Sequence, residues 1–469
     1  MSDSPFLTGN FAPVADELAV DGLPVQGRLP PELRGTLFRN GPNPHFTPVA
    51  PYHWFTGDGM VHAITLGDGA AKYRNRWVRT PRFLAEEAAG GPLFAGFGQP
   101  LTAAAGALDT GVANTHVIRH SERLLALEEA HPPTRLDPGD LLTLGYEDFG
   151  SLSGRFTAHP KHDPATGQLV FFSYAADSPA SPGPFSRGMS WGVIDADGRV
   201  SQHELFDSPY CSMVHDFAVT ASHVVFPVLP LTGSLDRAMA GRPPFAWDPA
   251  CGSFLGVLRR DRGVASLVWT EFEPCFAFHV MNAFDAPDGE MGDGGAEGGI
   301  VMDVVEYDAA PLFPRADGQP PTAAPSRLCR WRVDPAGQAS VRREVLDELP
   351  GEFPRIDERR AGLPYRHGFR ICQVGGADAV VHHDLDRRSR RLFTLPAGER
   401  ASEAVFVPRA ASSPEGDGWL LTVVWQPERG GSALFVLDAQ AVDQGPVAVV
   451  PLPQRMPFGF HGSWVPGPG

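Results

Sequence analysis

Four histidines occur at spacings that could bring their imidazole rings to one point. They are His159, His215, His279 and His461, each in apolar or strand-like sequence, and they are separated by 56, 64 and 182 residues. Imidazole is a ligand for iron, copper, zinc and nickel, and four neutral nitrogens without a thiolate leave a bound ion dipositive and redox-capable. We therefore take these four histidines as candidate ligands of one metal ion.

A repeated hairpin predicts the elements that must position these histidines. A hydrophobic strand, a tight turn marked by aspartate and a second strand recur about every 62 residues. The seven turn residues are Asp68, Asp137, Asp195, Asp261, Asp334, Asp386 and Asp438. A four-stranded propeller blade fits this length, and the histidine separations equal one, one and three periods. We expect an all-β, seven-bladed β-propeller that forms a single domain over residues 1–469, with cap insertions and a chain end that completes a terminal blade. The segment 92–108 is predicted to hold a short helix in the cap.

Composition narrows the class of protein. The net charge of −16 disfavours binding to nucleic acid and makes any contact with anionic lipid weak. Five cysteines without a CxxC motif favour a reducing compartment. The N-terminus resembles no signal peptide and no stretch approaches eighteen apolar residues, so we expect a cytoplasmic protein. Motifs of P-loop NTPases, Rossmann dehydrogenases and HExxH metalloproteases are missing from the sequence.

A zinc site is the alternative reading of two of the histidines. Cys211 precedes His215 by four residues, and Cys275 precedes His279 by four. On a strand, residues four apart lie about 13 Å apart, too far to share one ion, and the surrounding sequence does not favour helices. We therefore favour the four-histidine site.

Three acidic residues are candidates for accepting hydrogen bonds from the histidine rings. A metal-ligating histidine usually donates its second N–H to a carboxylate or carbonyl, which fixes the tautomer. Glu129, Glu352 and Glu403 lie in strand-like or tightly patterned sequence and could accept such hydrogen bonds, although each could equally be a solvated surface acid.

The sequence around these residues resembles the carotenoid cleavage oxygenase family, which includes lignostilbene dioxygenases and phenylpropene-cleaving enzymes. The resemblance extends from residue 38 to residue 464 and rests on the segments FRNGPNP, HWFTGDGMVHA, YRNRWVRT, ANT, FTAHPKHDPATG, MVHDFAVT, FHVMNAFD, GEFPRID and FHGSW. It implies Fe(II) on the axis of a seven-bladed propeller, bound by the four histidines and supported by the three glutamates. It also implies that the side chain of Thr115, in ANT, crowds one open coordination position.

The implied reaction is oxidative cleavage of a carbon–carbon double bond by O₂, which gives two carbonyl products from a small apolar alkene. In the stilbene and phenylpropene branch, a tyrosine and a lysine bind and deprotonate a 4-hydroxyphenyl group. Phe97 and Glu128 stand at those two positions here, and the only lysines, Lys72 and Lys161, belong to other motifs. We therefore expect a carotenoid or apocarotenoid substrate, with the 4-hydroxyphenyl alkene as the alternative.

Aromatic residues that could line an apolar substrate tunnel are Phe55, Phe94, Phe97, Phe278 and Phe284, although each could be ordinary core packing. A membrane-borne substrate would also imply a weak peripheral contact through an apolar patch near the tunnel mouth. Two other classes stay open at this stage. One is an isomerase or hydrolase that keeps the iron site, and the other is a propeller that serves only as a scaffold.

Overall fold

The computed structural model describes residues 4–49, 52–96, 99–181, 183–286 and 299–467. Its contacts divide the chain into two compact units, which are described separately. Unit 1 comprises Met1–Ala158, Gly375–Val381 and Arg391–Gly469, and unit 2 comprises His159–Val374 and His382–Arg390. That a single domain spans residues 1–469 stays a prediction.

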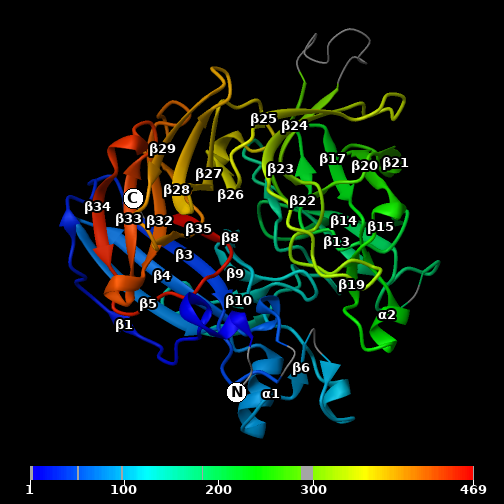
Figure 1. The fold of residues 1–469 in the computed structure, drawn as a ribbon, viewed down its shortest axis with the longest axis horizontal. Coiled ribbons are helices and arrows are strands. Elements are labelled where there is room, and N and C mark those ends of the chain that lie inside the picture. Colours follow the sequence, from blue (N-terminus) through cyan, green and yellow to red (C-terminus); the bar gives the residue numbers. More distant parts are fainter. Residues whose placement is uncertain (1–3, 50–51, 97–98, 182, 287–298, 468–469) are drawn as a thin grey trace. The chain divides into compact units, whose positions relative to one another are not determined.

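Unit 1 contains three antiparallel sheets of four or more strands among its described residues (Figure 1). The first has the order β1-β5-β4-β3-β35, the second β11-β10-β9-β8, and the third β2-β34-β33-β32-β30, with β31 also paired to β32. Their bounds are β1 Ala19–Val20, β2 Gln26–Gly27, β3 Gly35–Pro42, β4 Gly59–Gly67, β5 Ala70–Trp77, β8 His116–His120, β9 Arg123–Leu127, β10 Thr134–Leu136, β11 Thr143–Tyr146, β30 Arg400–Ala401, β31 Val405–Pro408, β32 Gly418–Gln426, β33 Gly431–Asp438, β34 Pro446–Pro451 and β35 Gly462–Pro466.

Unit 2 contains the other larger sheets of the described chain. Their orders are β12-β13-β14-β15, β16-β17-β20-β21, β22-β23-β24-β25 and β26-β27-β28-β29, of which β28 and β29 lie within unit 2 only over residues 382–390. Their bounds are β12 Lys161–His162, β13 Leu169–Ala176, β14 Gly188–Ile194, β15 Val200–Asp207, β16 Ala218–Val219, β17 His223–Val228, β20 Ser253–Arg259, β21 Gly263–Phe272, β22 Phe276–Asp285, β23 Ile300–Tyr307, β24 Arg327–Val333, β25 Arg342–Asp347, β26 Gly351–Ile356, β27 His367–Val374, β28 Ala377–Asp384 and β29 Ser389–Thr394.

Each of the seven aspartate turns predicted from the sequence lies at a hairpin of a different sheet. Asp68 joins β4 to β5, for example, and Asp261 joins β20 to β21. Asp68 adopts a positive φ of 51° and is followed by Gly69 with φ 76°, a left-handed pair that suits a tight two-residue hairpin turn. The hairpin prediction is therefore confirmed.

The two ends of the chain complete sheets of unit 1, as the propeller reading predicts. The C-terminal strand β35 pairs with β3, with Phe38 opposite Ser463, and the N-terminal strand β2 pairs with β34, with Gln26 opposite Val449. Each return strand supplies hydrogen-bond partners for a strand that would otherwise be an open edge. Because β35 begins one residue after His461, this pairing also fixes the position of that histidine.

Two short helices and two small hairpins complete the described fold. Helix α1 covers Pro81–Ala89 in unit 1, where the Thr80 hydroxyl accepts a hydrogen bond from the Phe83 N–H and Gly90 ends the helix in a left-handed conformation. Helix α2 covers Leu235–Met239 in unit 2. The hairpins are β6 Phe94–Ala95 with β7 Gln99–Pro100, and β18 Leu231–Gly233 with β19 Phe245–Trp247. The helix predicted within residues 92–108 is present as a 3-10 turn, Ala105–Ala107.

Buried apolar side chains between neighbouring sheets hold each unit together. In unit 1, strands β3, β4, β32 and β33 share one core cluster that includes Leu37, Leu421 and Leu434. In unit 2, strands β13, β14 and β17 share another that includes Phe172, Trp191 and Phe226. The outer strand β15 instead alternates between exposed and half-buried residues over most of its length, as expected for a strand with one face toward water.

We expect that replacing Leu421 by alanine lowers the free energy of unfolding by about 2–5 kcal/mol. Leu421 is fully buried in the unit 1 core, so truncation removes apolar contacts and leaves a cavity. Denaturant unfolding followed by tryptophan fluorescence measures the change. Leu205→Ala is the control, because that side chain is exposed on β15. Equal stabilities of the two variants would contradict the assigned core.

Candidate metal centre

Three of the predicted histidines converge within unit 2. His159 precedes β12, His215 lies between β15 and β16, and His279 lies inside β22. The Nε2 atom of His215 is 3.0 Å from Nε2 of His159 and 3.3 Å from Nε2 of His279. The ligand atoms of the group lie within 4.8 Å of one another. The side chains of His159 and His279 are buried, and that of His215 is half-buried.

These distances fit the coordination shell of a transition metal. Two imidazole nitrogens about 2.1 Å from an ion and at right angles to each other lie about 3.0 Å apart. The separations of 3.0 and 3.3 Å agree with that value. Among the described residues, the metal-ligand group contains histidines only. His279 lies on a strand four residues beyond the buried Cys275, so the structure does not support the zinc alternative.

Glu352, at the start of β26, holds the His279 ring. The Nδ1–H of His279 donates to Oε2 of Glu352 at 2.6 Å, which leaves Nε2 with its lone pair available for a metal. The Tyr307 hydroxyl donates to Oε1 at 2.7 Å, and the Phe353 N–H donates to Oε2 at 2.9 Å. Burial favours the neutral acid, but His279 and these two donors outweigh it and lower the pKa of Glu352.

His461 has an equivalent support within unit 1. Its Nδ1–H donates to Oε1 of Glu403 at 2.9 Å, and the Gly462 N–H donates to Oε2 at 3.0 Å. Only 1% of the Glu403 side chain is exposed. Two of the three predicted glutamates therefore accept the Nδ1–H of a predicted histidine. The third, Glu129, follows β9 and is half-buried, and its role stays a prediction.

Thr115 lies beside His461 in unit 1. The His461 N–H donates to the Thr115 carbonyl at 3.1 Å, and the Thr115 hydroxyl donates to Oδ1 of Asn114 at 3.0 Å. The Asn114 amide in turn donates to the carbonyls of Phe55 and Gly57. These bonds fix the Ala-Asn-Thr segment against both the His461 segment and the loop before β4. The side chain of Thr115 is therefore held in one place, while its role at a metal stays a prediction.

The aromatic residues predicted to contact substrate have different surroundings. Phe278 is buried with its ring 5.6 Å from that of His215, and Phe55 lies 5.5 Å from Phe460, next to His461. Phe94 lines a pocket at the cap of unit 1, where the guanidinium of Arg82 lies 5.2 Å from its ring centroid. Phe284 packs inside a hydrophobic core cluster of unit 2. Phe97 lies outside the described residues.

Glu128 is buried and already paired. Its Oε1 accepts the Val112 N–H at 3.0 Å and lies 2.8 Å from Nδ1 of His131. Burial disfavours the imidazolium, but Glu128 and Asp109 outweigh that effect and raise the pKa of His131. The Glu128 carboxyl group is therefore engaged by its own neighbours within unit 1.

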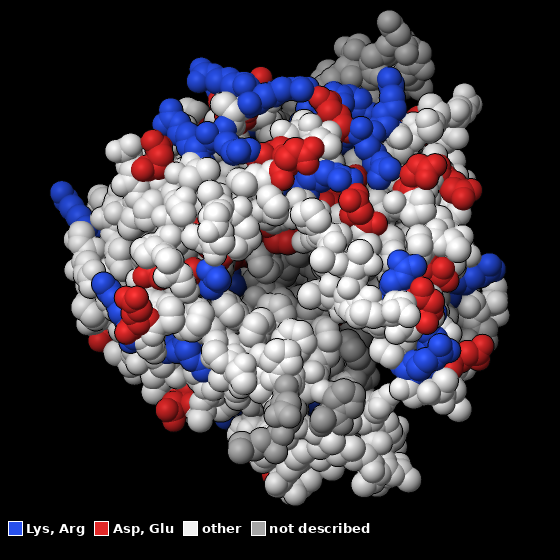
Figure 2. Space-filling view, in the orientation of Figure 1, with Lys and Arg blue, Asp and Glu red and all other residues white. Residues whose placement is uncertain are grey.

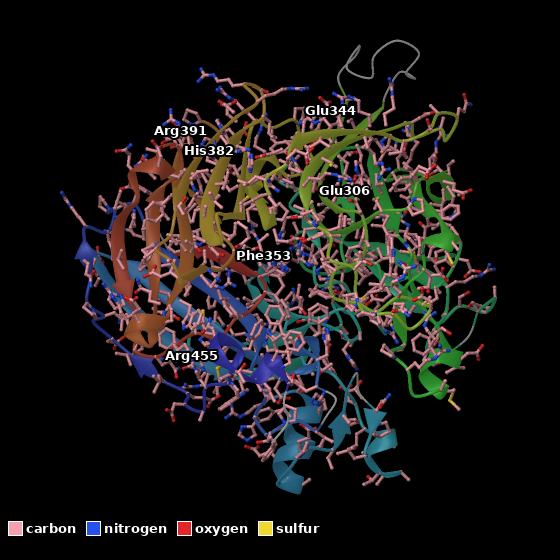
Figure 3. The ribbon with its side chains drawn as sticks, viewed as in Figure 1. Glu306, Glu344, Phe353, His382, Arg391 and Arg455 are labelled. Atoms are coloured by element: carbon pink, nitrogen blue, oxygen red, sulfur yellow. The ribbon has the colours of Figure 1, made fainter. Side chains whose placement is uncertain are left out.

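Sequence reasoning missed two residues that contact the centre, Tyr307 and Phe353. Burial and the neighbouring Glu352 raise the pKa of Tyr307, so its hydroxyl stays protonated and donates to that carboxylate. The Phe353 ring, on β26, lies 5.7 Å from the ring of His279, and Phe353 is labelled in Figure 3. Phe353 has a positive φ of 56°, which is uncommon for a bulky residue. No sequence motif signals such a conformation, although the Glu-Phe-Pro segment drew attention to its neighbour.

Basic and acidic side chains are mixed on the surface of unit 2. Figure 2 shows basic side chains beside acidic side chains over the region of β25. Glu344 accepts from both Arg332 and Arg388, and Arg390 pairs with Asp347. These ion pairs neutralise much of the positive charge in this region.

No helix in the described part of the chain has the length and apolar character needed to cross a membrane.

Comparison with known proteins identifies the family. Residues 11–466 match the family model described as retinal pigment epithelial membrane protein. The chain is 35% identical to isoeugenol monooxygenase of Pseudomonas nitroreducens, covering 99% of each chain. It is also 35% identical to carotenoid cleavage oxygenase of Mycobacterium tuberculosis, covering 99% of this chain and 98% of the relative.

The fold class follows from the same kind of comparison. The crystal structure of Pseudomonas brassicacearum lignostilbene dioxygenase matches with a TM-score of 0.91 and 32% identity, covering 99% of each chain. Together with the seven sheets of four or more strands among the described residues, this match confirms the seven-bladed β-propeller. The chain is an enzyme that belongs to the family of carotenoid cleavage oxygenases, the non-haem iron oxygenases that cleave alkenes.

Proposed function

We propose that the enzyme binds one Fe(II) through His159, His215, His279 and His461 and uses O₂ to cleave the C=C bond of a carotenoid or apocarotenoid. The observation that carries the metal site is the convergence of three Nε2 atoms at 3.0 and 3.3 Å in unit 2. His461 is the fourth ligand in this proposal because its Nδ1 faces a buried carboxylate in the same way as that of His279.

The protein residues prepare this site for the reaction. Iron supplies the binding and activation of O₂. Glu352 and Glu403 hold their histidines in the tautomer whose Nε2 carries a lone pair, and Glu129 is proposed to support a third histidine. Thr115 is proposed to restrict access to one open coordination position. Buried aromatic rings such as Phe278 keep water from the reacting alkene.

The engagement of both lysines supports a carotenoid-type substrate. Lys161 forms an ion pair with Asp216 at 2.6 Å, and Lys72 lies 3.3 Å from Asp21 on the surface of unit 1. A 4-hydroxyphenyl group that reacts as its phenolate needs a cation nearby. Glu128 stands at the position where the phenolic branch has lysine, and a carboxyl side chain cannot supply that cation. A polyene has no ionisable group and needs no such cation.

A second candidate is the alkene side chain of a stilbene or phenylpropene. One relative with 35% identity is named isoeugenol monooxygenase, and the matching crystal structure is a lignostilbene dioxygenase. The contact of Glu128 with His131 also favours this candidate, because it engages the carboxyl group within the fold and away from a bound phenol.

Oxygen uptake separates the two substrate classes. We expect iron-loaded enzyme to consume O₂ with an apocarotenal and to release two carbonyl products, with much slower uptake on a 4-hydroxystilbene. A chelator-treated sample is the control. Uptake on the 4-hydroxystilbene alone would retain the iron site and overturn the carotenoid assignment. Conversion of either compound without O₂ uptake would instead indicate an isomerase or hydrolase.

We propose that the part of unit 1 around helix α1, β7 and the 3-10 turn Ala105–Ala107 contacts a membrane that carries the substrate. Leu84, Leu101 and Leu108 are exposed there, around α1 and β7. Apolar side chains of this kind enter the headgroup boundary of a bilayer. The net charge of −16 keeps the contact weak and peripheral, so we place the enzyme in the cytoplasm, reversibly bound at a membrane surface.

A further inference from the structure

Asp216 links the three chain segments that carry the histidines of unit 2. It directly follows His215, and its Oδ1 lies 2.6 Å from Nζ of Lys161, two residues after His159. Its Oδ2 accepts the Val280 N–H at 2.8 Å, and Val280 directly follows His279. One carboxylate therefore contacts all three histidine-bearing segments.

The Asp216 carboxylate is buried and fully engaged. Only 3% of its side chain is exposed, and Oδ1 also accepts the Phe217 N–H at 2.8 Å. The ammonium of Lys161 lies 5.8 Å from the centroid of the buried Phe217 ring. A buried ion pair gains little net stability, because desolvation offsets the attraction between the charges, but it fixes geometry where its hydrogen bonds are satisfied.

Lys161 is also one of only two lysines in a chain with 39 basic residues. Its ammonium is a compact charge with three donors on a flexible stem, so it reaches a carboxylate on a neighbouring segment without the planar geometry that arginine needs. The other lysine, Lys72, pairs with Asp21 through largely exposed side chains. Lys161 is thus half-buried against a buried carboxylate, whereas Lys72 forms a surface pair, and the two provide a matched comparison.

We propose that Lys161 and Asp216 are positioning residues that hold His159, His215 and His279 in the converged arrangement before the metal binds. This inference rests on the proposed iron site and goes beyond it, because neither residue is a ligand. The Nε2 atoms of the three imidazoles lie 3.0 and 3.3 Å apart, where their lone pairs repel one another unless a cation lies between them. The Lys161–Asp216 pair stabilises that unfavourable arrangement through its contacts with the segments that carry the histidines.

The two partners can be tested separately. Lys161→Met removes the cation and leaves the Asp216 bonds to the Phe217 and Val280 N–H groups in place. Asp216→Asn retains an acceptor for Val280 but presents no charge to Lys161. The double variant Lys161→Met/Asp216→Asn buries no unpaired charge, so it keeps the test valid if a single variant fails to fold. Lys161→Arg is the conservative rescue, and Lys72→Met is the matched control.

The experiment is titration of metal-free full-length protein with Co²⁺, followed by the visible d–d absorption of the bound ion, with folding checked by circular dichroism. We expect the double variant to be folded, to bind Co²⁺ at least about tenfold more weakly, and to show an altered d–d spectrum. Lys161→Arg should recover most of the affinity and the spectrum. Lys72→Met should match the wild type.

The outcomes distinguish this inference from the proposed function. If the double variant had the Co²⁺ affinity and the d–d spectrum of the wild type, the positioning role of Lys161 and Asp216 would be overturned. The proposed iron site would still stand. The positioning role would also be overturned if the d–d spectrum were unaltered and Co²⁺ binding fell only in proportion to the loss of folded protein. That result would indicate that the pair stabilises the fold and does not position the histidines. Wild-type protein that binds neither Co²⁺ nor Fe²⁺ would instead overturn the proposed function.

Discussion

Replacing His215 by alanine is expected to remove iron and alkene cleavage together. His215 is the central member of the unit 2 group, since its Nε2 lies 3.0 Å from that of His159 and 3.3 Å from that of His279. Without it, the remaining two imidazoles cannot enclose an ion from three sides. Replacing a residue that hydrogen-bonds to a metal ligand typically lowers metal affinity or activity by about 10- to 100-fold. Loss of a ligand itself should therefore exceed that range.

Metal analysis and O₂ uptake on the same preparation measure this effect. His203→Ala is the matched control, because His203 lies on the outer strand β15 with an exposed side chain, and we expect it to retain iron and activity. Full activity in His215→Ala would remove this histidine from the metal site. Retained iron with lost activity would assign His215 a role other than ligation.

Replacing Glu352 by glutamine is expected to weaken iron binding or turnover by about 10- to 100-fold. The glutamine carbonyl could still accept from His279 or from Tyr307, but the charge that strengthens both bonds is lost. The neutral amide would also present N–H donors to groups that are themselves donors. The same change at Glu403 should act in the same direction through His461.

Dissociation of iron in the presence of a chelator, followed over time, reports this change directly. Glu358→Gln is the control, since that side chain is 58% exposed and pairs with Arg355 on the surface. Identical iron retention in Glu352→Gln and the wild type would show that His279 needs no carboxylate. The proposed role of Glu352 would then be withdrawn, while the ligand set would stand.

The sequence predicts the repetitive part of this molecule well, because each propeller blade needs the same hairpin and the same kind of tight turn. Each hairpin needs a turn that accepts left-handed backbone, so aspartate and glycine mark it, as at Asp68 and Gly69. The histidines were found because they follow the same period. The acids behind His279 and His461 were found because a ligand histidine requires an acceptor for its second N–H.

Other features lack a period and were not predicted. Helix α1 carries a clear start signal, with Thr80 as N-cap and Pro81 in the first turn, but the sequence analysis does not predict a helix there. The bond from Tyr307 to Glu352 joins residues 45 positions apart, and the contact of Asp216 with the Val280 N–H spans 64. Such contacts depend on how sheets pack, which local sequence does not encode.

The substrate class cannot be assigned from the residue type at one or two positions. Glu128 argues against a phenolate when considered alone, but the structure pairs it with His131 and reduces that objection. The lysine argument survives, because both lysines are engaged elsewhere. Relatives from both substrate classes have the same 35% identity to the chain, so overall similarity does not separate the classes.

Metal analysis of the purified wild-type protein tests the central claim most directly. The account predicts about one iron per chain, lost on chelation and restored with Fe²⁺, together with O₂ uptake on an alkene substrate. Folded protein that holds no iron, does not bind added Fe²⁺ and consumes no O₂ would contradict it.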